Sequence, residues 1–68
     1  MEINEVKLHH LITSRIDKIE KIVEGTGYKV KTVVGVATFL LDNDGDVDLL
    51  TSKQQATFEK FLKPLLER

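Results

Sequence analysis

The chain has 68 residues and no cysteine, and its ten lysines and arginines nearly balance eleven aspartates and glutamates. This length fits one small domain, residues 1–68. The lack of cysteine excludes disulfides and thiolate zinc sites. The balanced charge excludes the basic footprint of a typical nucleic-acid-binding domain, so the composition argues against nucleic acid as a partner.

Neither a targeting segment nor a membrane segment is visible. The first ten residues, MEINEVKLHH, lack the basic start and apolar core of a signal peptide. The longest apolar run, VVGVATFLL, has nine residues, whereas a membrane-spanning helix needs about 20. We therefore expect a cytoplasmic protein with no membrane partner.

The first segment predicts one long helix with Asn4 as a candidate N-cap. Its apolar residues recur at helical spacings, at Leu8, Ile12, Ile16, Ile19 and Val23. Gly25 and Gly27 follow this stripe, as glycines commonly do at helix ends. The repeat covers barely two heptads, so we interpret it as a core face. Pairing with the same helix of a second copy is the alternative.

Residues 28–41 predict a long β-strand, because β-branched and aromatic residues dominate them. The run is apolar on both strand faces from Val33 onward, and its fourteen residues exceed the usual five or six. Gly35 indicates a bulge or the close approach of another backbone. A short second strand at 47–51 can pair only with the C-terminal end of the first.

The last segment predicts a second helix. Thr51 or Ser52 can cap it, and Gln54 or Gln55 can complete a capping box. Its apolar stripe consists of Phe58, Phe61, Leu62, Leu65 and Leu66. Pro64 interrupts this stripe and predicts a kinked helix or a short separate last turn.

The predicted fold is therefore α+β, with the order α-β-β-α and two helices packed on a small antiparallel sheet made by a β-hairpin. Residues 28–36 have no strand partner in the chain, and an open strand edge is a liability. Pairing across a two-fold axis would continue the sheet through a homodimer and add the burial that a small chain lacks. Residues 1–6 could instead fill the gap as an extra strand.

The leading functional hypothesis is a non-enzymatic protein-association module that forms a homodimer through the long strand 28–41. The residues expected at the interface are Tyr28, Val30, Val34 and Val36. No base is placed beside a serine or threonine as nucleophilic catalysis requires. We accordingly predict no catalytic residue and no cofactor.

The stretch DNDGDVD, residues 42–48, raises the alternative of a divalent-cation-binding module. It does not match an EF-hand loop in any frame, because required ligands or the required glycine are missing. The pair Asp44-Gly45 is typical of a tight hairpin turn, which would scatter the carboxylates over both faces. A three-residue loop would gather Asp42, Asp46 and Asp48 on one face, where they could bind a cation. We favour the two-residue loop.

A further alternative is a small nucleic-acid-binding dimer that uses Lys29 and Lys31 beside Tyr28. Two lysines per chain are few for this role. A basic stripe that also included Lys18 and Lys21 would strengthen the hypothesis.

Overall fold

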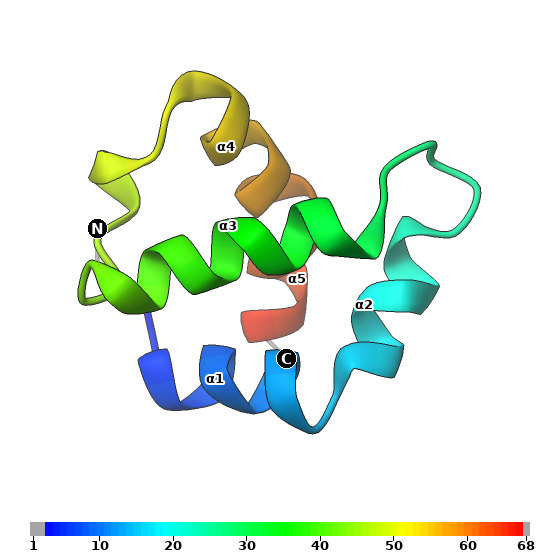
Figure 1. Cartoon of the computed structure of the whole chain (residues 1–68), viewed down its shortest axis with the longest axis horizontal. Coiled ribbons are helices and arrows are strands. Elements are labelled where there is room, and N and C mark those ends of the chain that lie inside the picture. The colour runs from blue at the N-terminus through cyan, green and yellow to red at the C-terminus, as the bar shows by residue number, and fades with distance from the viewer. Residues whose placement is uncertain (1–2, 68) are drawn as a thin grey trace.

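The computed structural model describes residues 3–67, and the regular elements of this part of the chain are all helical (Figure 1). Helix α1 spans Glu5–Thr13, α2 spans Ile16–Val23, and α3 spans Val30–Asp42. Helix α3 crosses the middle of the molecule and contacts the other helices on several sides (Figure 1).

The second half of the chain consists of shorter helical elements that pack beside α3. A 3-10 turn, η1, spans Val47–Leu49, and α4 spans Ser52–Thr57. The helical path then continues as a π-helix, η2, over Phe58–Leu62, and ends in α5 at Lys63–Leu66. No helix among residues 3–67 is long and apolar enough to cross a membrane.

The predicted α+β fold is wrong, because residues 28–41 form most of α3 rather than a strand. The buried residues of α3 are Val33, Val36, Ala37 and Leu40. Their spacing of three, one and three is that of a helix face. Because α3 contacts α1, α2, α4 and η2, it needs apolar residues around much of its circumference. These additional apolar residues make the helical spacing hard to recognise in the sequence. Burial of these side chains outweighs the weak β-propensity of valine and threonine.

The predicted β-hairpin is also wrong, and Asp44-Gly45 instead ends α3. Asp44 and Gly45 both have positive φ, 57° and 74°. The Gly45 N–H donates to the Leu40 carbonyl at 2.7 Å, as in the Schellman motif that closes many helices. The same left-handed backbone that aspartate and glycine favour in hairpin turns therefore serves here as a helix stop.

The predicted single N-terminal helix is interrupted near Ser14 and Arg15. The backbone N–H groups of both residues donate to the His10 carbonyl, at 2.8 and 3.1 Å, and Arg15 leaves the helical region with φ −129° and ψ 33°. The Asn4 cap is confirmed, since its side chain accepts from the Lys7 N–H at 3.1 Å. Helix α1 begins at Glu5, so residues 5 and 6 do not form an extra strand, and residues 1 and 2 lie outside the described part.

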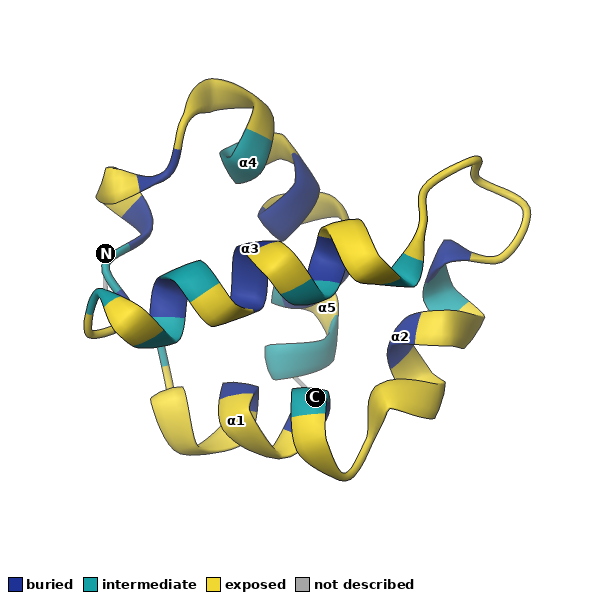
Figure 2. Cartoon of the chain, in the orientation of Figure 1, coloured by how far each residue is buried: buried dark blue, intermediate teal, exposed yellow. Residues whose placement is uncertain are grey.

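One cluster of buried side chains joins α1, α2, α3, η1 and η2 (Figure 2). The π-helix contributes the two largest fully buried side chains, Phe58 and Phe61, and also Leu62, and all three are at most 1% exposed. A wide helical turn accommodates the proline that follows, since the Lys63 N–H donates to the Phe58 carbonyl five residues earlier and Pro64 has no N–H. The expected short last turn is present as α5.

The capping box predicted for the last helix is confirmed at Thr51 and Gln54. The Gln54 N–H donates to Thr51 Oγ1 at 3.2 Å, and the Thr51 N–H donates to Gln54 Oε1 at 3.0 Å. We expect Thr51→Ala to lower the free energy of unfolding by about 1 kcal/mol, as measured by urea denaturation. Ser52→Ala, one residue further on, is the control and should change it by less than about 0.5 kcal/mol. Equal losses in the two variants would contradict the assignment.

Candidate functional site

The four residues predicted at a strand interface do not form an edge. Val36 is 5% exposed and belongs to the core. Val30 and Val34 are partly buried against the same core. Only Tyr28, just before α3, presents a large part of its side chain to solvent, with 39% exposed. The strand-pairing surface is therefore absent, and Tyr28 remains as a candidate contact residue.

The aspartates predicted to hold a cation lie along the turn from the end of α3 to η1. Asp42 and Asp48 are exposed, and Asp46 is half-buried. The Asp46 carboxylate accepts from the Asp48 backbone N–H at 3.0 Å and thereby caps η1. Within residues 3–67, no group of three or more histidine, aspartate or glutamate side chains is placed to hold a metal ion.

A groove lies between α3 and α4, beside Tyr28. It has a volume of about 450 Å³. Helix α3 contributes Lys31, Thr32, Gly35 and Val36, and the opposite wall consists of Thr51, Lys53, Gln54 and Thr57. A shallower hollow adjoins it and shares Tyr28, Thr32 and Lys53. We call the two together the lysine groove, because Lys29, Lys31 and Lys53 are among their lining residues.

The rim of the lysine groove is positively charged, and no aspartate or glutamate among its described lining residues neutralises this charge. Lys29, Lys31 and Lys53 are all exposed, and neither hollow is lined by a described aspartate or glutamate. A fourth ammonium group is close by, since Lys60 Nζ lies 5.3 Å from the centre of the Tyr28 ring. Like charges gathered in this way repel one another, so the fold gains nothing from their proximity.

Tyr28 is held in place by the loop that precedes α3. Gly25 and Gly27 turn this loop with φ of 78° and 84°. The Thr26 hydroxyl donates to the Val23 carbonyl at 2.6 Å and accepts from the Tyr28 N–H at 3.2 Å. The Tyr28 ring meets the buried Phe61 ring edge-on, with centroids 4.7 Å apart. The aromatic wall of the groove is therefore a supported part of the fold, which favours a contact surface.

Gly35 leaves an opening in the groove wall. It lies in the middle of α3 and is exposed, and a Cβ at this position would meet nothing within 4 Å beyond its chain neighbours and its own helix backbone. Glycine inside a helix costs about 1 kcal/mol relative to alanine, and no packing contact here requires it. Among residues 3–67, neither the bulge nor the close backbone approach expected at Gly35 is present.

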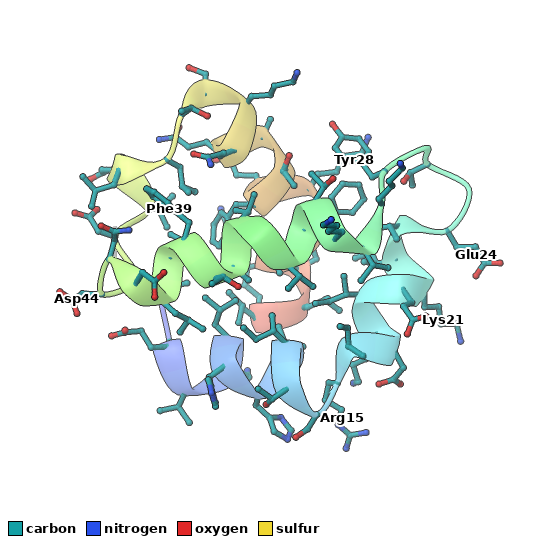
Figure 3. The ribbon with its side chains drawn as sticks, in the orientation of Figure 1. Arg15, Lys21, Glu24, Tyr28, Phe39 and Asp44 are labelled. Carbon is teal, nitrogen blue, oxygen red and sulfur yellow. The ribbon has the colours of Figure 1, made fainter. Side chains whose placement is uncertain are left out.

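The charges at the ends of α3 oppose its helix dipole. Lys29 caps its N-terminus and Lys31 lies in the first turn, whereas Asp42 is its last residue. Acidic residues normally stabilise the first turn of a helix and basic residues the last, by about 0.3–1 kcal/mol each, and α3 has neither. Figure 3 shows Tyr28 and Asp44 near opposite ends of this helix. The charged side chains at the two ends of α3 therefore do not stabilise this helix through its dipole.

The basic stripe that would have joined Lys18 and Lys21 to Lys29 and Lys31 is not formed. Lys21 lies in a hollow lined also by Asp17, Glu20 and Glu24. Lys53 and Lys60 take the place of the expected pair around Tyr28. Sequence reasoning missed Lys53 because only the packing of α4 on α3 brings it near.

Three comparisons bear on the chain as a whole. No protein-family model, no curated protein and no solved structure matches it.

Proposed function

We propose that this protein is a non-enzymatic, cytoplasmic protein-association module whose lysine groove binds an acidic, partly apolar segment of a partner protein. The observation that supports this proposal most directly is the lysine rim without a neutralising carboxylate around a groove of about 450 Å³. A groove of this volume can hold a few side chains of a peptide.

The chemistry of the groove favours a segment that combines carboxylates with one apolar side chain. Lys29, Lys31 and Lys53 can bind carboxylates at the rim. Between them, Tyr28 and the open side of Gly35 offer apolar surface that would otherwise stay in contact with water. Rim charges of this kind mainly raise the association rate and select the partner, so binding should weaken as salt increases.

Nucleic acid fits the same groove less well. The net charge is −1, and four aspartates crowd the far end of α3, where they repel an extended polyanion. The rim has lysines but no arginine, although arginine is the commonest side chain for reading guanine. A short acidic peptide avoids these costs.

Peptide display on the purified protein tests the proposal. Peptides selected by the wild type should contain aspartate or glutamate beside a leucine-like residue. The variant Lys29→Glu with Lys53→Glu should lose these peptides, with at least about a tenfold drop in affinity. The control, Lys18→Glu with Lys21→Glu, makes the same change in net charge outside the groove and should keep them.

Two results would overturn the proposal. The first is the selection of peptides without acidic residues. The second is tighter binding of a random-sequence oligonucleotide than of any selected peptide, which would assign the groove to nucleic acid. Circular dichroism of each variant establishes that it is folded before binding is compared.

A further inference from the structure

We infer that the segment bound by the lysine groove is the η1 turn of a second copy of this chain, with Leu49 as its anchor, so that two copies exchange turns about a two-fold axis. This inference rests on the proposed function, because it names the partner of the same groove. It also replaces the strand-mediated homodimer with a dimer built from helices.

Leu49 is presented to solvent on a fixed support. Its side chain is 53% exposed, whereas its neighbours Val47 and Leu50 are 7% and 5% exposed. The Leu49 N–H donates to the Asp46 carbonyl at 3.2 Å. The Gln55 side-chain amide also donates to the carbonyls of Val47 and Leu50, at 3.3 and 3.4 Å. The turn is therefore held on both sides of Leu49, and Leu49 does not line the lysine groove of its own chain.

The η1 turn and the lysine groove are complementary in charge and in shape. Leu49 follows four aspartates, Asp42, Asp44, Asp46 and Asp48. The groove has three lysines on its rim and no described carboxylate. Its exposed apolar part consists of Tyr28 and the space beside Gly35, where a Cβ would meet nothing within 4 Å beyond its chain neighbours and its own helix backbone. An exposed leucine flanked by carboxylates matches the segment that this groove should select.

The position of the turn relative to the groove favours a closed pair. Leu49 is two residues from Thr51, which lines the groove, so donor and acceptor surfaces are neighbours on each copy. When both surfaces adjoin, one two-fold axis lets each copy insert its Leu49 into the groove of the other. The same contact then forms twice, and the burial supplements a core that is small in any 68-residue chain.

Sedimentation over a dilution series tests the inference at low salt. The wild type should change from a dimer to the 7.7 kDa monomer as it is diluted. Leu49→Lys should raise the dimer dissociation constant by about 30-fold or more, because it removes the central anchor. The matched control is Val6→Lys, on an 81% exposed valine of α1, and it should leave the dimer unchanged.

A charge exchange identifies the two surfaces. Lys29→Glu with Lys53→Glu reverses the groove, and Asp42→Lys with Asp48→Lys reverses the turn. Each double variant alone should stay monomeric at concentrations where the wild type is dimeric. An equimolar mixture should dimerise again, because each copy then offers the charge that the other needs.

Two outcomes overturn the inference. If the wild type is monomeric throughout, or if Leu49→Lys dimerises like the wild type, Leu49 is not the anchor of a homodimer. If the groove still selects acidic peptides although the wild type is monomeric, the proposed function stands and only the homodimer is rejected. Loss of peptide selection would remove the proposed function itself, so the two failures are distinguishable.

Discussion

Phe61→Ala is expected to remove most of the free energy of unfolding and to leave much of the chain unfolded at 37 °C. Phe61 is 1% exposed and lies in η2 between the core and Tyr28. Truncation of a buried phenylalanine to alanine costs about 3–5 kcal/mol, because apolar contacts are lost and a cavity remains. At about 0.05–0.15 kcal/mol per residue, a chain of this length has only about 3–10 kcal/mol in total.

Thermal and urea unfolding followed by circular dichroism measure this loss. Phe61→Leu retains most of the apolar volume and should fall between the wild type and Phe61→Ala. Val6→Ala, at an 81% exposed position, should change the free energy by less than about 0.5 kcal/mol. If Phe61→Ala unfolds at the same urea concentration as the wild type, Phe61 is not part of the core, and the support of Tyr28 by η2 has to be abandoned.

Local signals in the sequence predicted where some helices begin or end better than they predicted whether a segment is a helix or a strand. The Thr51 and Gln54 capping box depends on residues three positions apart, so it can be recognised without knowledge of distant contacts. Gly25 and Gly27 likewise end the N-terminal helical region as predicted. No glycine or proline marks the break at Ser14 and Arg15 in the sequence. The break lets α1 and α2 pack against the same core.

The error at α3 has a physical cause that extends to the candidate site. A helix enclosed by other helices needs apolar side chains in several directions, so valines and leucines fill the positions that a strand would also favour. The spacing of Val33, Val36, Ala37 and Leu40 was the available sign of a helix. From the sequence, Tyr28 was a candidate interface residue and Lys29 a candidate nucleic-acid contact, both at the start of a predicted strand. The contributions of Lys53 and Leu49 could not be predicted, because they depend on where η1 and α4 pack.

Alanine substitution at two glycines is expected to change stability in opposite directions. Gly45 has φ 74°, and a Cβ there would lie 3.2 Å from side-chain carbons of both Ile3 and Glu5. The left-handed backbone alone costs alanine about 1–2 kcal/mol, and the crowding adds to this cost. We therefore expect Gly45→Ala to lower the free energy of unfolding by about 1–3 kcal/mol, and to loosen the turn that carries Leu49.

Gly35→Ala is the matched counterpart, since the same methyl group enters a regular helix with no atom within 4 Å. Its expected gain is about 1 kcal/mol from helix propensity, which corresponds to a rise of about 4–8 °C in the Tm of a small domain. The added methyl also fills the opening in the lysine groove, so Gly35→Ala should weaken dimerisation and peptide binding while it stabilises the monomer. Thermal unfolding at a concentration where the protein is monomeric, together with sedimentation at higher concentration, separates the two effects. A stabilised Gly35→Ala that binds as tightly as the wild type would mean that partners do not use the space beside Gly35.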